Sequence, residues 1–262
     1  MTRLWLIGCG NMAGAMLSRW LATGMDAAGI TVIDPATMRD DVRVVRALPD
    51  EAPPELLMLG IKPQMLGDVA PGLQAAAAGA LVVSILAGTT TSSLRVAFPK
   101  ARAIVRAMPN LPVAIGKGVV GLHGALSKED YLAVGAMMAP LGLVEWIADE
   151  SHFDAVTALS GSGPAFVYRF IDALAQGGAA LGLPLDQAAR LALATVEGAG
   201  SLAAASAIAP AALADQVASK GGSTREGLDV FDAEDAILKL VAAALKTAEL
   251  RNREMAELTR PD

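Results

Sequence analysis

The chain has 262 residues, of which 53% are hydrophobic, and a formal net charge of −6. This is enough apolar material for one large domain or two modest ones, and it argues against disorder. The acidic balance, without clusters of Lys and Arg, argues against nucleic acid as the binding partner.

The cysteine and histidine content limits the chemistry further. Cys9 is the single cysteine, and with two histidines it gives neither an internal disulfide nor a metal-ligand spacing. Arg3 followed by LWLIGCGNMAGAML resembles a signal peptide, but glycines and Asn11 interrupt it. No run of about 18 apolar residues is free of charges and breakers. We therefore expect a cytoplasmic protein without a metal.

The first half alternates short aliphatic or β-branched runs with helical stretches such as 11–24 and 64–77. The expected strands are 4–8, 30–34, 56–61, 81–86, 104–108 and 119–122. Strands this short, separated by helices, are typical of a mostly parallel sheet covered on both faces. We therefore expect a doubly wound α/β domain over residues 1–150.

The second half has a different pattern. Long Ala- and Leu-rich helical segments are expected near 163–181, 185–206 and 233–257, with no convincing strand among them. These segments are apolar nearly all round, which a small solvated bundle tolerates poorly. We expect an all-α domain over residues 151–262, with part of its surface buried against another subunit.

The first expected strand runs directly into GCGNMA at 8–13, and a helix follows. This is the spacing of a dinucleotide-binding turn, in which Gly8 permits the tight turn, Gly10 lets the backbone approach a pyrophosphate and Ala13 allows close helix packing. The helix N-terminus then offers N–H groups to the phosphates. The expected cofactor contacts in this turn are Gly8, Gly10, Asn11 and Met12.

Asp34 ends the second expected strand. At this position an acidic side chain can accept hydrogen bonds from the adenosine ribose and repel a 2′-phosphate, which favours NAD over NADP. The alternative is that Asp34 only begins the turn Asp34-Pro35. Arg39 lies close enough in sequence to complicate the choice.

Three further expected strands end in turns at the edge where open α/β sheets bind ligands. Each of them alone could be only a turn, but together they indicate cofactor contacts. The turns are Lys62-Pro63, Ala87-Gly88 and Met108-Pro109-Asn110.

The approach to the first long helix is the stretch GSGP at 161–164. Its small residues suit either contact with a flat ring or a hinge that ends in an N-cap. His123, in a polar loop, and His152, near the domain junction, have no nucleophile motif beside them, so we expect neither to be catalytic.

Six blocks of the chain, taken together, resemble pyrroline-5-carboxylate reductases. The blocks are IGCGNM at 7–12, IKPQ at 61–64, SILAG at 84–88, VRAMPNLP at 105–112, TALSGSGPAFVY at 157–168 and ASKGGSTREGLDVF at 218–231. The resemblance implies a Rossmann domain followed by an all-α dimerisation domain, and reduction of (S)-1-pyrroline-5-carboxylate to L-proline with NADPH or NADH. It also implies a homodimer and allows a larger ring of dimers.

The resemblance assigns the last block to the substrate. Ser219 would offer its hydroxyl and the backbone N–H groups near Gly222, Ser223 and Thr224 would bind the carboxylate, an arrangement that Gly221 and Gly222 make sterically feasible. Thr224 would hydrogen-bond the ring nitrogen and is the expected catalytic residue. A protonated imine is already electrophilic, so we expect no general base.

The chain departs from the family pattern at several positions. Lys220 stands where Pro is usual, and Ala214 stands where Lys is often found. Asp34 stands where many members contact a phosphate, and the connection from the second strand to IKPQ is short. The departure at Asp34 leaves the choice between NADPH and NADH open.

Two other functions compete with this one. A β-hydroxyacid dehydrogenase shares the domain order, but it relies on a Lys and an Asn on its first interdomain helix, and residues 158–180 contain neither. A noncatalytic dinucleotide-binding regulator is compatible with the fold. The intact GGST segment at 221–224 argues against it, because a sensor needs no substrate cradle.

Overall fold

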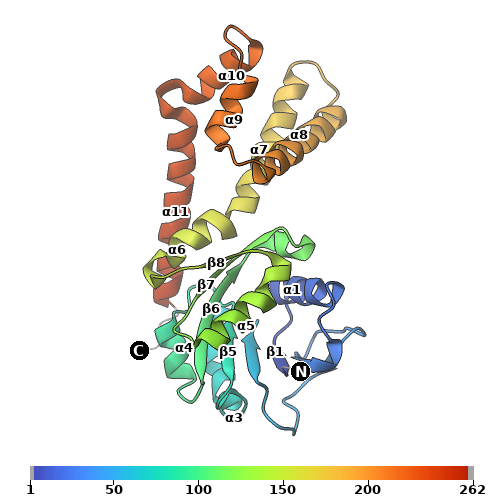
Figure 1. The fold of residues 1–262 in the computed structure, drawn as a ribbon, viewed down its shortest axis with the longest axis vertical. Helices are drawn as coiled ribbons and strands as arrows, with labels where there is room; N and C mark the ends of the chain where they lie inside the picture. Colours follow the sequence, from blue (N-terminus) through green and yellow to red (C-terminus); the bar gives the residue numbers. More distant parts are fainter. Residues whose placement is uncertain (1–2, 259–262) are drawn as a thin grey trace. The chain divides into compact units, whose positions relative to one another are not determined.

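The computed structural model describes residues 3–258, with side chains described through residue 254. The described chain forms two compact units: one contains the residues up to 162 together with those from 248 onward, and the other contains 163–247. In Figure 1 the first unit begins with the blue and green ribbon, and the second runs from yellow to red. The assignment of separate roles to 1–150 and 151–262 stays a prediction.

The first unit is built on one sheet, whose described strands follow the order β3-β2-β1-β4-β5-β6-β7-β8. Neighbouring strands are parallel except β6 and β7, which are antiparallel. The mostly parallel, doubly wound sheet is therefore confirmed. The strands are β1 Leu4–Ile7, β2 Ile30–Ile33, β3 Arg43–Val45, β4 Leu56–Leu59, β5 Leu81–Ser84, β6 Ala103–Pro109, β7 Gly118–His123 and β8 Gly142–Trp146.

Helices cover both faces of this sheet (Figure 1). On one face, α1 and α5 pack on the strands, and the fully buried Trp20 donates its indole N–H to the Met137 carbonyl at 2.7 Å. On the other face, side chains such as Leu73 and Leu94 pack on Trp5 and Ile104. The α-helices of this unit are α1 Asn11–Ala22, α2 Leu66–Val69, α3 Gln74–Ala77, α4 Thr91–Ala97, α5 Lys128–Met138 and α6 Phe153–Val156.

Two features of the first unit differ from the expectation. The expected helix over 64–77 is helical throughout but is not one regular α-helix: α2 and α3 alternate with 3-10 segments, because Pro71 supplies no N–H and Gly67 and Gly72 weaken the helix. The edge strands β3 and β8 were not predicted, since they are short and only half-buried.

Short non-α turns join these elements. They are η1 Ala27–Gly29, η2 Pro63–Met65, η3 Ala70–Leu73, η4 Leu111–Ile115, η5 Ala139–Leu141, η6 Glu150–His152, η7 Thr157–Gly161 and η8 Ala233–Asp235, of which η7 is a π-helical turn. The boundary between the two compact units lies directly after η7, between Ser162 and Gly163. Single π-helical turns often occur at functional sites.

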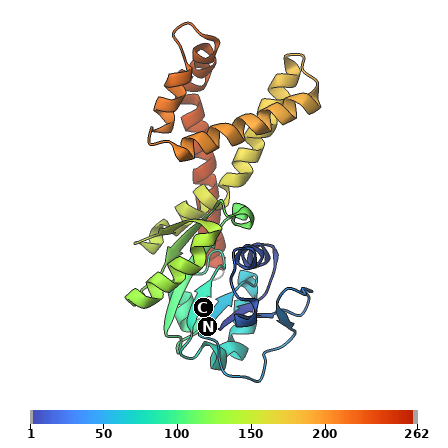
Figure 2. The ribbon, with the colours of Figure 1, turned by 45° about the vertical axis from the view of Figure 1, so that its right-hand side comes forward.

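The second unit consists of helices, as expected (Figure 2). The helices α7 and α8 form a hairpin, joined by residues 181–184. The last helix returns to the first unit at its C-terminal end, where the Asn252 amide donates to the Asp154 carbonyl at 3.3 Å. The helices are α7 Gly163–Ala180, α8 Leu185–Ala205, α9 Pro210–Val217, α10 Ser223–Asp232 and α11 Ala236–Leu258.

The helical unit exposes many large apolar side chains. Leu202, Val230 and Leu240 have 65%, 72% and 72% of their surfaces exposed, and Phe170 has 42%. Exposed apolar surface on this scale marks an interaction surface. Among the described helices, none is long and apolar enough to cross a membrane.

Candidate active site

The expected cofactor residues of the first unit gather along one edge of its sheet. Parallel pairing aligns the ends of four neighbouring strands, so that Ile33, Ile7, Leu59 and Ser84 lie in one row. The residues just beyond this row therefore share the carboxyl edge, where ligands of open α/β sheets bind. They include Gly8, Gly10, Asn11, Met12, Asp34, Lys62, Pro63, Ala87 and Gly88, with Met108, Pro109 and Asn110 on the neighbouring β6.

The two glycines of the first turn have different physical roles. Gly8 has a φ of +81°, and a Cβ there would lie 2.8 Å from Ile61 Cγ2. Gly10 has an ordinary φ of −69°, and a Cβ there would meet no described atom within 4 Å. Gly8 is thus required by the fold, whereas the space beside Gly10 is open to a ligand.

Gly60 is a second glycine that the fold requires, and the sequence analysis missed it. A Cβ on Gly60 would lie 2.6 Å from the Gly8 carbonyl oxygen and 2.8 Å from Ala13 Cβ. Its position inside the expected strand 56–61 was the available signal, because a glycine within a strand often marks a close backbone approach. Gly60 allows β4 and the start of α1 to approach each other closely.

The N-terminus of α1 is free to bind an anion. Gly10 is its N-cap and no side chain caps it. The first helical hydrogen bond joins Gly14 N to the Gly10 carbonyl at 2.7 Å, so the N–H groups of residues 11–13 precede the helical ladder. These donors and the open space at Gly10 fit the pyrophosphate of a dinucleotide.

The carboxylate of Asp34 is engaged with the backbone. Its Oδ2 accepts from Cys9 N at 2.7 Å, and its Oδ1 accepts from Ala36 N at 2.8 Å and Thr37 N at 2.9 Å. Burial alone would raise the pKa of Asp34, but these hydrogen bonds outweigh it and hold the pKa below its ordinary value. Asp34 therefore both begins a turn and fixes the dinucleotide loop.

Beyond Asp34, the loop between β2 and β3 surrounds an open hollow of about 550 Å³. Its lining includes Arg39 and Arg46. Arg39 pairs with Asp41 at 2.5 Å and donates to Ser18 Oγ at 3.1 Å. Arg46 is exposed and forms no ion pair within the described part of the chain. Asp40 also lines the hollow and Asp41 pairs with Arg39, so Arg46 is the basic side chain of the lining without an ion pair among the described residues.

The remaining strand ends differ in how much of their surface is free. Lys62 and Ala87 are exposed, and Gly88 has a φ of +73°. Asn110 is buried, and its amide accepts from Val119 N at 2.8 Å and donates to the Ser160 carbonyl at 2.9 Å. The Asn110 side chain thus joins β6 to η7, and its contact with a cofactor stays a prediction.

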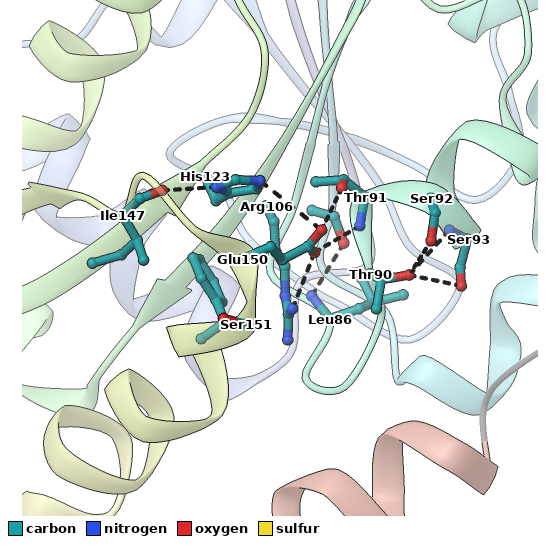
Figure 3. Close-up of polar contacts among 12 residues, drawn as sticks. Leu86, Thr90, Thr91, Ser92, Ser93, Arg106, His123, Ile147, Glu150 and Ser151 are labelled. Atoms are coloured by element: carbon teal, nitrogen blue, oxygen red, sulfur yellow. Dashed lines mark hydrogen bonds and ion pairs between the residues drawn. The ribbon is translucent and has the colours of Figure 1, made fainter.

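A buried polar cluster behind this edge was missed by the sequence analysis (Figure 3). Arg106, with only 5% of its surface exposed, pairs with Glu150 at 3.1 Å, and its guanidinium lies 4.4 Å from the centre of the Phe153 ring. Burial would raise the pKa of Glu150, but hydrogen bonds from Thr91 and the Arg106 charge hold it below its ordinary value. An arginine inside an otherwise apolar strand was the available signal.

The two histidines also occupy defined places. His123 ends β7 and does not lie in a loop as expected; its Nδ1 contacts the Ile147 carbonyl at 2.7 Å, and its Nε2 lies 4.0 Å from Glu150 Oε2. His152 ends η6. Neither is next to a nucleophile motif, so a noncatalytic role for both stays the prediction.

The expected substrate residues lie in the helical unit, in the turn between α9 and α10. Gly221 has a φ of +72°, and Gly222 N donates to the Ser219 carbonyl at 2.9 Å. Gly222 is the N-cap of α10 and no side chain caps that helix, whose first two residues are Ser223 and Thr224. The turn therefore presents free N–H groups of the kind that bind a carboxylate.

Arg225 fastens the two helices on either side of this turn. It lies 3.4 Å from Asp215 on α9, and 2.9 Å and 2.8 Å from Asp229 and Asp232 on α10. Lys220 at the tip of the turn is exposed. Arg225 is paired with three aspartates, whereas Lys220 forms no ion pair with the described residues.

Comparison with known proteins decides the family. Residues 150–255 match the model of the pyrroline-5-carboxylate reductase dimerisation domain, and residues 3–88 match that of NADP oxidoreductase, coenzyme F420-dependent. A pyrroline-5-carboxylate reductase of Pseudomonas aeruginosa is 35% identical over 97% of each chain. The chain belongs to the pyrroline-5-carboxylate reductase family.

Other relatives agree across nearly the whole length. A pyrroline-5-carboxylate reductase of Synechocystis is 38% identical over 94% of this chain and 97% of its own. The solved pyrroline-5-carboxylate reductase of Coxiella burnetii has a TM-score of 0.89 at 29% identity, covering 97% of this chain and 98% of its own. The Rossmann domain followed by a helical dimerisation domain is thereby confirmed.

Membership in the pyrroline-5-carboxylate reductase family also decides the enzyme class. The chain is an oxidoreductase that uses NADPH or NADH, and neither the β-hydroxyacid dehydrogenase nor the noncatalytic regulator is its family. The match to a dimerisation domain supports a homo-oligomer. The exposed apolar side chains of the second unit are consistent with such an assembly.

Proposed function

We propose that the chain reduces (S)-1-pyrroline-5-carboxylate to L-proline, the last step of proline biosynthesis, in the cytoplasm. The observation that carries this proposal is the turn at 219–224, whose uncapped helix start and left-handed Gly221 suit a small carboxylate. The relatives that match nearly the whole chain carry the same name.

The residues of the turn would divide the work of holding the substrate. Ser219 with the N–H groups of Ser223 and Thr224 binds the carboxylate, and Gly221 and Gly222 allow the approach. The Thr224 hydroxyl orients the ring nitrogen. Holding the carboxylate and the nitrogen together would fix where the imine carbon lies, and such alignment is the main requirement of hydride transfer.

The residues of the first unit fit a dinucleotide. The open space at Gly10 and the uncapped start of α1 would take the pyrophosphate, with Asn11 and Met12 in its first turn. The turns at Lys62-Pro63, Ala87-Gly88 and Met108-Pro109-Asn110 would line the rest of the site. When bound, the reduced nicotinamide would supply the hydride to the imine carbon, which becomes C5 of proline, and solvent would protonate the resulting amine.

We infer a preference for NADPH from the loop beyond Asp34. Three backbone N–H groups already hold the Asp34 carboxylate in the loop, so its charge is partly satisfied before a cofactor binds. Arg39 and the unpaired Arg46 line the adjacent hollow and would attract a 2′-phosphate. This inference favours the family's usual cofactor over the NADH that the position of Asp34 alone suggested.

Arg46→Ser tests the cofactor preference. We expect roughly a tenfold loss of kcat/KM with NADPH and no change with NADH, because one exposed phosphate contact contributes about 1.4 kcal/mol at most. Arg43→Ser is the matched control, since Arg43 pairs with Glu51 and lies outside the hollow. Equal losses with both cofactors would contradict a role at the 2′-phosphate.

Steady-state reduction of pyrroline-5-carboxylate, run in parallel with NADPH and NADH, tests the reaction itself. We expect turnover with both and the higher kcat/KM with NADPH. A protein that binds a dinucleotide but turns over with neither would overturn the proposed reaction and leave the fold in place.

The assembly is proposed to be a homodimer formed by the helical units, with a ring of dimers as the larger form. The exposed apolar side chains of α7, α8 and α11 support burial against a second copy. Sedimentation at micromolar concentration should give a dimer or an even multiple of it; a monomer with full activity would contradict the proposal.

A further inference from the structure

Glu150 reaches from η6 to the first residue of α4. Its Oε1 accepts from Thr91 N at 2.8 Å, and its Oε2 accepts from Thr91 Oγ1 at 2.5 Å (Figure 3). The N–H groups at a helix start have no partner within the helix, so an outside carboxylate is a strong acceptor for one of them. The two bonds fix both the backbone and the side chain of Thr91.

The same carboxylate is held from behind by the sheet. Arg106 Nη1 on β6 donates to Glu150 Oε1 at 3.1 Å, and the guanidinium lies against the Phe153 ring of α6. Arg106 is buried, so its position is set by packing and not by solvent. Glu150 therefore connects Arg106, on a rigid strand, to Thr91. These two residues are 15 positions apart in the sequence.

Between β5 and Thr91 lies the Ala87-Gly88 turn. On the strand side, Ile85 N still donates to the Leu59 carbonyl at 3.1 Å. After that point Ala87 is exposed and Gly88 adopts a φ of +73°. Thr89 N donates to the Leu86 carbonyl at 3.4 Å across this turn, and the bonds from Thr91 to Glu150 add a second constraint at its far end.

We propose that Glu150 is a positioning residue for the reaction, because by holding Thr91 it fixes the Ala87-Gly88 backbone at the carboxyl edge of the sheet. The inference rests on the proposed function, which assigns this turn to the cofactor. Glu150 touches neither cofactor nor substrate in this role; it acts through Thr91.

Glu150→Ala removes the contact, and hydrogen exchange of residues 87–91 in the cofactor-free protein reports on the turn directly. We expect faster exchange there, weaker NADPH binding, and roughly a tenfold loss of kcat with little change in KM for pyrroline-5-carboxylate. Glu150→Gln keeps an acceptor for Thr91 N and should recover most of the kcat.

Asp130→Ala is the matched control. Asp130 is a buried carboxylate on α5 that pairs with Arg102, which precedes β6 at the opposite edge of the sheet. Its loss should lower the melting temperature, as the loss of Glu150 does, but it should leave exchange at 87–91 and kcat unchanged.

Thr91→Val keeps the Arg106–Glu150 pair and removes only the hydroxyl bond, so it tests the proposal even if Glu150→Ala folds poorly. We expect the same changes as for Glu150→Ala at a smaller size, and Thr91→Ser should behave as wild type. Effects of Thr91→Val and Glu150→Ala should be non-additive in a double variant, because both act on one contact.

Two results would overturn the proposal: unchanged exchange at 87–91 in Glu150→Ala, or a kcat loss in Glu150→Ala that Thr91→Val does not share. Failure of the proposed function is a separate result. In that case the wild type would not reduce pyrroline-5-carboxylate, while exchange at 87–91 would still report whether Glu150 holds the turn.

Discussion

Thr224→Ala is expected to lower kcat roughly a hundredfold while leaving cofactor affinity nearly unchanged, because the hydroxyl orients the ring nitrogen at the reacting centre. Thr224 is exposed in the first turn of α10, and its hydroxyl forms no hydrogen bond with the described residues. The substitution therefore removes no internal contact, and the melting temperature should stay within about one degree of wild type. Steady-state kinetics and direct titration of NADPH give the two quantities.

Two variants serve as controls for Thr224→Ala. Thr224→Ser retains the hydroxyl and should keep most of the activity. Thr247→Ala makes the same substitution on α11, where the hydroxyl only donates back to the Ala243 carbonyl at 2.9 Å, and it should have no effect on turnover. Equal losses of kcat and of cofactor affinity in Thr224→Ala would mean that the threonine is structural.

Gly10→Val is expected to abolish most cofactor binding in a protein that still folds. The φ of Gly10 suits any residue and its Cβ would meet no described atom, so the valine costs the fold little. The side chain would, however, occupy the space through which a pyrophosphate approaches α1. Each lost hydrogen bond to a charged group costs about 1.5–3 kcal/mol, so we expect roughly a hundredfold rise in the Kd for NADPH.

Gly8→Val should impair folding, whereas Gly10→Val should impair cofactor binding, so the two variants are best compared directly. At a φ of +81° and 2.8 Å from Ile61 Cγ2, a side chain is both strained and obstructed. We expect a melting temperature many degrees lower, or little soluble protein. Thermal unfolding and cofactor titration on both variants separate the roles, and a Gly10→Val protein that binds NADPH normally would exclude the pyrophosphate from this turn.

Some elements could be predicted from the sequence because their causes are local. Buried parallel strands such as LLML at 56–59 are continuous apolar runs, and the long helices are continuous Ala- and Leu-rich segments. The turn after β1 follows from glycine geometry and residue spacing, whereas the GGST segment was assigned to the substrate by its resemblance to the family. The edge strand β8 was harder to predict, because it is only half-buried and lacks a continuous apolar run. The interruptions at 63–77 were also harder to predict, because Pro71 lies inside a stretch with helical periodicity.

Other features depend on residues far apart in the chain. The carboxylate of Asp34 accepts from the backbone of Cys9, 25 positions away, because parallel pairing of β1 and β2 brings their ends together, and its contact with a ribose stays a prediction. No local pattern specifies such a partner.

The sequence alone determined the family, the order of sheet and helices, and the residues proposed to touch cofactor and substrate, since each rests on short motifs or local periodicity. Only the tertiary structure decided that Asp34 serves the loop, that Gly60 is as constrained as Gly8, and that Glu150 joins Arg106 to Thr91. The reason is physical: those roles come from contacts between strand ends, and such contacts exist only once the sheet has assembled.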